Sequence, residues 1–207
     1  MKVSIYVEGG GDQLNTLTEC RHGFVEFIRK MLPGKAKPRV IPCGGRGAAY
    51  KDFCTAVAQL KEGEKALLLV DSEEPVTPDD LPWNHLNKRA GDGWEKPEQS
   101  DETDVCMMVQ CMESWFLADP DTVAAYYKKD FKKTKLPKLG KGGVETISKQ
   151  KVQQSLKSAT CQTQKGPYHK TRHGFALLAI IEPERVIAAS EHASKFRDLL
   201  DKWLDSR

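Results

Sequence analysis

The chain has 207 residues, enough for one domain with its own core, and its 39% hydrophobic content is that of an ordinary globular protein. No apolar run reaches the roughly 18 residues that a membrane span requires, and the six cysteines include no C-x-x-C pair typical of zinc sites. The net charge is only +3, but residues 71–104 hold eleven acids against three bases, and residues 128–172 hold thirteen bases against two acids. The basic segment is typical of a polyanion-binding surface or of a solvated lysine-rich one.

Short apolar segments alternate with helical patterns along the first half of the chain. The uninterrupted run ALLLV is typical of a central parallel strand covered on both faces. Residues 75–103 are rich in turn-forming residues and predict a long loop, and residues 128–165 predict a basic loop with a helical piece. In chain order, we expect strands at VSIYV, PRVIPC, ALLLV and the start of DVCMMVQCMESWFLAD, and helices over residues 13–31, 50–60, 174–190 and 194–204.

This order predicts an α/β fold with a mostly parallel sheet of about four strands flanked by helices. We expect a core over residues 1–120, with 75–103 as a loop insertion. Residues 121–207 would form a basic loop and C-terminal helices packed on that core. Because no signal-peptide pattern precedes the first strand, a cytoplasmic location is expected.

Acidic residues follow the ends of three predicted strands. Glu8 follows the first, Asp71 and Glu73 end the third, and Glu113 lies just past the fourth. The carboxyl ends of parallel strands meet at one edge of the sheet, which is where ligands bind in such folds. Carboxylates packed together repel each other unless their pKa values rise or a cation joins them, and oxygen ligands favour Mg²⁺, Mn²⁺ or Ca²⁺ over zinc.

The three glycines at positions 9–11 remove side-chain bulk beside Glu8, so that a phosphate or a metal-bound water can approach. Asp12 is then either a further ligand or the N-cap of the next helix. EGGGDQL lacks the third glycine of a dinucleotide site, and GGRGAAYKD lacks the G-K-[ST] of a P-loop. His169 and His173 fit a phosphate contact or plain surface better than a metal site, and Arg46 fits either a phosphate contact or a surface loop.

VEGGGD at the end of the first strand and LLLVDSE at the end of a later one resemble the Toprim domain, with its strand-terminal Glu-Gly and downstream Asp-x-Asp. With MESWFLADP and KTRHGFALLAIIEPERV added, the pattern resembles the bacterial Toprim-related family catalogued as domain of unknown function 4276, over nearly the whole chain. The resemblance implies a Toprim-like (Rossmann-like) sheet with a helical C-terminal extension.

The resemblance also implies roles for individual residues. Glu8 matches the strand-one glutamate, a metal ligand and general acid or base. Asp71 and Glu73 match the Asp-x-Asp pair, with glutamate in place of the second aspartate. The two-metal nuclease branch adds further acids and a lysine, whose candidates here are Asp12, Glu113, Lys165 and Lys170.

The function implied is a Mg²⁺- or Mn²⁺-dependent nuclease acting on DNA or RNA, an effector in phage defence with an ATPase partner and no membrane partner. The alternatives are a non-catalytic Toprim-fold module that docks to a partner ATPase, and a phosphohydrolase for small phosphates. The residues expected to contact nucleic acid are Arg46, Lys132, Lys133, Lys135, Lys138, Lys141, His169 and Arg172.

Overall fold

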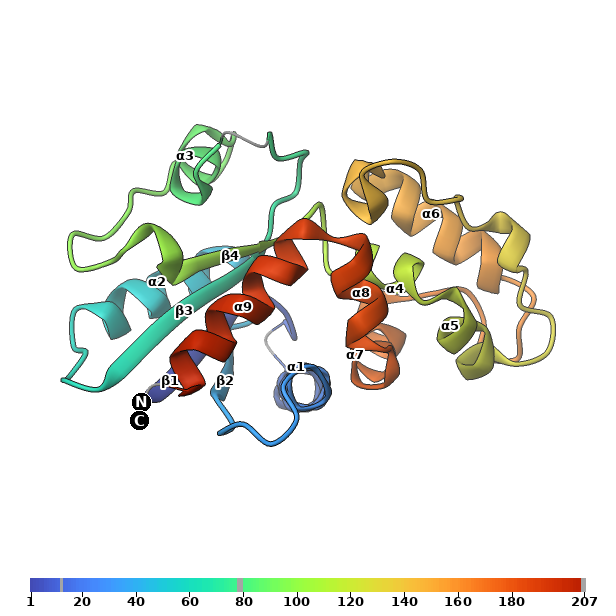
Figure 1. The fold of residues 1–207 in the computed structure, drawn as a ribbon. Helices are drawn as coiled ribbons and strands as arrows, with labels where there is room; N and C mark the ends of the chain where they lie inside the picture. Colours follow the sequence, from blue (N-terminus) through green and yellow to red (C-terminus); the bar gives the residue numbers. More distant parts are fainter. Residues whose placement is uncertain (12, 78–79, 206–207) are drawn as a thin grey trace.

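The structure, a computed structural model, describes residues 1–11, 13–77 and 80–205. Its sheet has four strands in the order β2-β1-β3-β4, and all three pairings are parallel (Figure 1). The predicted α/β fold with a mostly parallel sheet of about four strands is therefore confirmed. The strands are β1 (Lys2–Val7), β2 (Arg39–Pro42), β3 (Glu64–Asp71) and β4 (Val105–Met108).

Helices cover both faces of the sheet, because the central strands send apolar side chains to both sides. Ile5 and Leu69 pack with α1 (Leu14–Met31), α7 (Phe175–Ile180), α8 (Pro183–Ala189) and α9 (Glu191–Asp205). Leu68 and Val70 pack with α2 (Arg46–Val57) and α3 (Pro82–Lys88) on the other face. The alternation of successive β3 residues between two cores explains the uninterrupted apolar sequence.

Three elements differ from the expected ones. The expected helix over residues 174–190 is two helices, α7 and α8, because Pro183 keeps Glu182 extended between them. Helix α2 begins at Arg46 rather than Tyr50, since Gly47, Ala48 and Ala49 carry little hydrophobic pattern but continue the helix. Helix α3 lies inside the expected loop 75–103, with Trp83 and Leu86 buried against the α2 face of the sheet. A helix of seven residues with only two buried apolar side chains is too short to show a helical period in the sequence.

The C-terminal region is helical, as predicted. Helices α4 (Ser114–Ala118), α5 (Pro120–Tyr127) and α6 (Lys149–Thr160) lie beyond the carboxyl ends of the strands, and α9 returns to pack along β4 and β1 (Figure 1). A π-helical turn, Lys170–Gly174, leads into α7. Within the described ranges, no helix combines the length and apolar character needed to cross a bilayer.

Helices α1 and α7 approach each other closely at Gly23. A Cβ on this glycine would lie 2.7 Å from the carbonyl oxygen of Phe175, so only glycine allows the two backbones this contact. The contact fixes the start of α7, and with it the π-helical turn that immediately precedes it.

Candidate metal centre

Three carboxylates meet at the carboxyl edge of the sheet. Glu8 directly follows β1, Asp71 is the last residue of β3, and Glu73 lies two residues further on. Strands β1 and β3 are parallel neighbours, with Val7 opposite Leu69, so their ends lie side by side. One oxygen from each carboxylate lies within 4.8 Å of those of the other two. The structure therefore brings together the three acids that the sequence placed at strand ends.

Asp71 is the buried member of this cluster, at 1% exposure. The backbone N–H of Met112 donates to its Oδ1 at 2.8 Å, and the Lys170 ammonium donates to its Oδ2 at 3.2 Å. These two bonds hold the carboxylate in one orientation and stabilise its charge.

Glu73 has a backbone φ of 68°, which is uncommon for a residue with a side chain. Its N–H donates to the carbonyl oxygen of Gln110 at 2.8 Å, which fixes this turn beyond β3. The Lys149 ammonium donates to both oxygens of Glu73, at 2.5 and 2.6 Å, and lies 3.7 Å from Oδ2 of Asp71. Sequence reasoning missed Lys149, because nothing distinguishes it among the thirteen bases of its segment.

Glu8 meets Arg46, at the start of α2. The Arg46 Nη1 donates to Oε2 of Glu8 at 3.0 Å and to the carbonyl oxygen of Asp71 at 2.5 Å. Burial and the charge of Asp71 raise the pKa of Glu8, although Arg46 and Lys170 oppose the rise. A further cation beside Glu8 would stabilise its charged form.

Arg46 is held from its other side by Asp92. Its Nε and Nη2 donate to the two oxygens of Asp92 at 2.8 and 2.6 Å, and its guanidinium lies 4.7 Å from the ring centroid of Trp94. Burial raises the pKa of Asp92, but hydrogen bonds and charges from Arg46 and Arg89 lower it overall. Asp92 and Trp94 lie in the expected loop and could not be predicted as neighbours of the cluster. They hold Arg46, which was predicted to contact nucleic acid, in a position where it bonds Glu8.

Lys170 lies between Asp71 and Glu113. Its ammonium is 4.0 Å from Oε2 of Glu113, whose side chain is fully buried. The Tyr168 hydroxyl donates to Oε1 of Glu113 at 3.2 Å, while Oε2 has no hydrogen-bond partner in the described part of the molecule. The charge of Asp71, opposed by burial, raises the pKa of Lys170, so this lysine stays charged at neutral pH. Burial and the charge of Glu113 likewise raise the pKa of Tyr168.

The other candidate lysine, Lys165, lies elsewhere. Its ammonium sits over the ring of Tyr126, 4.6 Å from the centroid. His169 and Arg172 are exposed and flank Lys170 in the chain, and His169 Nδ1 lies 3.1 Å from the hydroxyl of Thr171. Asp12 lies outside the described residues.

The remaining predicted nucleic-acid contacts lie in the segment between α5 and α6, and all are exposed. Lys133 pairs with Asp121 at 2.5 Å. With Lys138, it lines a hollow of about 670 Å³ that Leu117 and Leu136 also line. The other exposed members are Lys132, Lys135 and Lys141.

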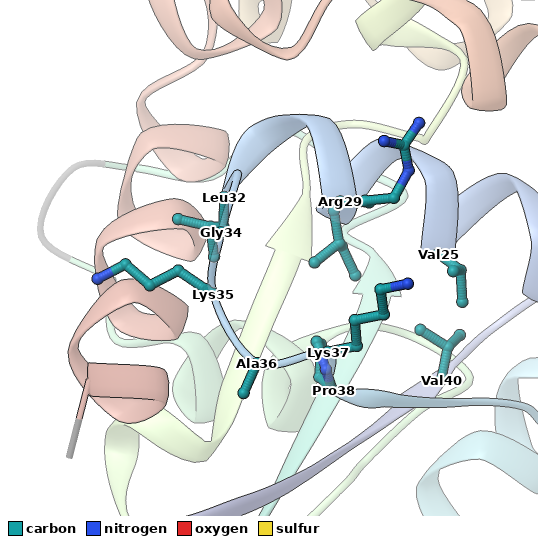
Figure 2. Close-up of a pocket in the computed structure, with 10 residues that line it drawn as sticks. Val25, Arg29, Leu32, Gly34, Lys35, Ala36, Lys37, Pro38 and Val40 are labelled. Carbon is teal, nitrogen blue, oxygen red and sulfur yellow. The ribbon is translucent and has the colours of Figure 1, made fainter. Parts of the chain in front are cut away.

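Figure 2 shows a second hollow, at the opposite end of the sheet from the three carboxylates. It has a volume of about 190 Å³ and lies between the end of α1 and the start of β2, with Val25, Leu32 and Val40 among its apolar walls. Among the described residues that line it, none carries a carboxylate. This hollow therefore has no part in the acidic cluster.

The molecule thus belongs to the class of α/β proteins with a parallel sheet whose carboxyl edge carries acidic and basic side chains together. The family described as a domain of unknown function (DUF4276) matches residues 7–201, and the chain belongs to this family. The matched span contains the whole cluster, from Glu8 to Lys170. No curated protein and no solved structure matches the chain significantly.

Proposed function

We propose that this protein is a Mg²⁺- or Mn²⁺-dependent nuclease of Toprim type, which hydrolyses phosphodiester bonds in DNA or RNA. The observation that carries the proposal is the convergence of Glu8, Asp71 and Glu73 to within 4.8 Å at the edge of a parallel sheet. The order of the strand-terminal sequences VEGGGD and LLLVDSE supports the relation to Toprim domains.

The donor set fits a hard divalent cation. All three groups are carboxylates, the ligands that Mg²⁺ and Mn²⁺ prefer. Two oxygens bound to one ion at about 2.0–2.6 Å lie at most roughly 4–5 Å apart, and the oxygens of the cluster meet this limit after small side-chain movements. The three glycines after Glu8 have positive φ values of 142°, 90° and 55°, a conformation that favours glycine, and a Cβ at Gly11 would have no atom within 4 Å.

The basic side chains of the cluster suit a phosphate substrate. The side chains of Lys149 and Lys170 are 26% and 35% exposed, so each lysine is partly open to solvent while bonded to a carboxylate. Arg46, at 15% exposure and bonded to Asp92, positions Glu8. A bound ion would activate a water molecule and stabilise the charge of the reacting phosphate. Lys149 and Lys170 would then bind the phosphate oxygens.

Charges further from the cluster extend the substrate surface. His169 and Arg172 flank Lys170, and the segment between α5 and α6 carries several exposed lysines, of which Lys133 pairs with Asp121. Contacts of this kind to a phosphate backbone are independent of sequence and sensitive to salt. Action in the cytoplasm as a phage-defence effector, with an ATPase partner, is part of this proposal and rests on the resemblance to Toprim proteins.

The test is cleavage of plasmid DNA and of a structured RNA with Mg²⁺ or Mn²⁺. Glu8→Gln and Asp71→Asn should each reduce the rate by at least about 100-fold, since each removes a ligand charge without changing side-chain size. Glu98→Gln, an exposed acid of the same acidic segment, serves as the matched control and should cut at the wild-type rate. Undiminished cutting by both cluster variants rejects the proposal.

One observation favours a second candidate, the non-catalytic docking module. Each carboxylate of the cluster already bonds a basic side chain: Glu8 with Arg46, Asp71 with Lys170, and Glu73 with Lys149. In a purely structural cluster these pairs would suffice. Millimolar Mg²⁺ or Mn²⁺ would then leave the melting temperature unchanged, whereas an ion that binds the native state raises it.

A further inference from the structure

We infer that the Lys170 ammonium takes the place of a second divalent cation between Asp71 and Glu113, so that this chain binds one catalytic ion rather than two. Glu113 accordingly holds Lys170 in position instead of binding metal. The inference rests on the proposed function, because it takes the ion at Glu8, Asp71 and Glu73 as its starting point.

The position of Lys170 is that of a bridging cation. Two-metal sites place their ions about 3.5–4 Å apart, with carboxylates shared between them. Here the carboxylate that would be shared is that of Asp71, which belongs to the cluster and shares the Lys170 ammonium with Glu113. Its Oδ1 accepts a hydrogen bond from the N–H of Met112. Its Oδ2 accepts the Lys170 ammonium at 3.2 Å, and the same ammonium lies 4.0 Å from Oε2 of Glu113. A positive charge therefore already lies between the two acids.

Glu113 requires such a charge. Its side chain is fully buried, and a buried carboxylate is stable only when it is paired and hydrogen-bonded. Tyr168 satisfies Oε1, and Oε2 has no hydrogen bond within the described residues but faces Lys170. The Glu113 carboxylate, held by the Tyr168 hydroxyl, thus places a negative charge at a fixed position beside the Lys170 ammonium.

The backbone holds Lys170 in place from several directions. Lys170 opens the π-helical turn, a local widening that redirects side chains relative to an α-helix. Before the turn, the N–H of Tyr168 donates to the Thr160 hydroxyl at 2.7 Å, and after it Phe175 packs against Gly23. These contacts fix the backbone from which the Lys170 side chain reaches Asp71.

A fixed ammonium has a defined part in phosphodiester hydrolysis. The bond from phosphorus to the water oxygen forms, the bond to the leaving oxygen breaks, and the proton of the water passes to solvent. The leaving oxygen carries the electron pair of the broken bond. Lys170 stabilises this developing negative charge, the part that a second metal ion plays in two-metal enzymes.

The test counts Mn²⁺ ions bound per folded chain, by equilibrium dialysis and by the electron paramagnetic resonance signal of free Mn²⁺. Wild-type protein should bind one ion. Lys170→Met removes the charge at nearly constant size and should bind two, whereas Lys170→Arg should still bind one. Adding Glu113→Gln to Lys170→Met should return the count to one. Lys157→Met, an exposed lysine on α6, is the matched control and should bind one.

Glu113→Gln alone should change the Mn²⁺ dissociation constant by less than about threefold. The inference is overturned if the wild type binds two ions, if folded Lys170→Met binds one, or if Glu113→Gln no longer binds Mn²⁺. In each of these cases the proposed metal site at Glu8, Asp71 and Glu73 still stands. No ion on the wild type rejects the proposed function itself. If circular dichroism shows that Lys170→Met is unfolded, the number of Mn²⁺ ions bound by the wild type and the Mn²⁺ affinity of Glu113→Gln still test the inference.

Discussion

Each acid of the candidate metal centre has a basic neighbour close enough to compete with a metal ion. Glu73 and Lys149 are the clearest pair, because one ammonium bonds both carboxylate oxygens. An ion that binds Glu73 must displace Lys149, whose partial exposure leaves room for it to move. The apparent metal affinity therefore depends on the strength of this ion pair.

Lys149→Met should tighten Mn²⁺ binding by about 3- to 10-fold, because removing one competing charge is worth roughly 1 kcal/mol in a partly exposed site. Isothermal titration calorimetry measures the effect. Lys151→Met, an exposed lysine on the same helix, is the control and should bind Mn²⁺ as the wild type does. Unchanged or weaker binding by Lys149→Met would show that Glu73 is no ligand.

Sequence reasoning reached the acids of this centre but only some of their partners. Glu8, Asp71 and Glu73 could be predicted because each follows a strand, and parallel strands end at one edge. Lys149 and Asp92 could not, because their positions depend on how segments far apart in the chain pack together. Tyr168 lies in a sequence with no regular period, so its bond to buried Glu113 also had no local signal.

Glu145 forms hydrogen bonds that connect two elements far apart in the sequence. Its Oε1 accepts the Ser190 hydroxyl at 2.6 Å and the N–H of His192 at 2.9 Å, which ties the 3₁₀ turn Gly143–Thr146 to the start of α9. Burial raises the pKa of Glu145, but these hydrogen bonds and His192 lower it overall. A lowered carboxyl pKa means that the folded state favours the charged form.

Glu145→Gln should lower the free energy of unfolding at pH 7 by roughly 1.5–3 kcal/mol, since it weakens hydrogen bonds to a charged group. The wild-type advantage should be fully present above the ordinary glutamate pKa of about 4.3 and disappear as the pH falls through the lower native pKa. Urea unfolding of the wild type and the variant at pH 7 and pH 3.5 measures the difference in their free energies of unfolding at each pH. An advantage that grows toward low pH would contradict the assignment.

The contact between α1 and α7 leads to a separate prediction. Gly23→Ala should destabilise the fold by about 1–3 kcal/mol despite the better helix propensity of alanine, because the new Cβ would collide with the Phe175 backbone. Gly47→Ala in α2 is the matched control, with no atom within 4 Å of the new Cβ, and should be neutral or stabilising. Equal unfolding midpoints for the two variants would mean that α7 shifts away from the new Cβ without loss of stability.

For the elements, the strands were predictable because each is a compact apolar run bounded by turn residues. Helix α3 was not, because its anchors Trp83 and Leu86 reveal a helix only when they meet the face of the sheet. The start of α2 at Arg46 was missed for a related reason, since small residues carry no periodic signal.

At the scale of the molecule, the two charged segments behave differently. The acidic segment is partly neutralised from within and from neighbouring elements, as in Asp92 with Arg46 and Asp80 with Lys88. The basic segment between α5 and α6 instead presents exposed lysines. A polyanion would meet positive charge there and around Lys170.

Binding of a fluorescent 20-nucleotide single strand in EDTA should weaken steeply as salt rises, because phosphate contacts release bound cations. The double substitution of Lys135 and Lys138 by glutamine should reduce the slope of log affinity against log salt by about 1–2. Glutamine at Lys51 and Lys61, exposed lysines beside the sheet, is the matched control and should leave the slope unchanged. Salt-independent binding would exclude the phosphate backbone as the contact.

Diffraction at the manganese absorption edge, from crystals soaked in Mn²⁺, shows whether an ion binds between the three carboxylates. We expect one anomalous peak bounded by Glu8, Asp71 and Glu73, at about 2.0–2.6 Å from their oxygens, with the Lys149 ammonium displaced from Glu73. If the carboxylates keep their bonds to Arg46, Lys149 and Lys170 and no peak lies between them, this edge of the sheet is not a metal site.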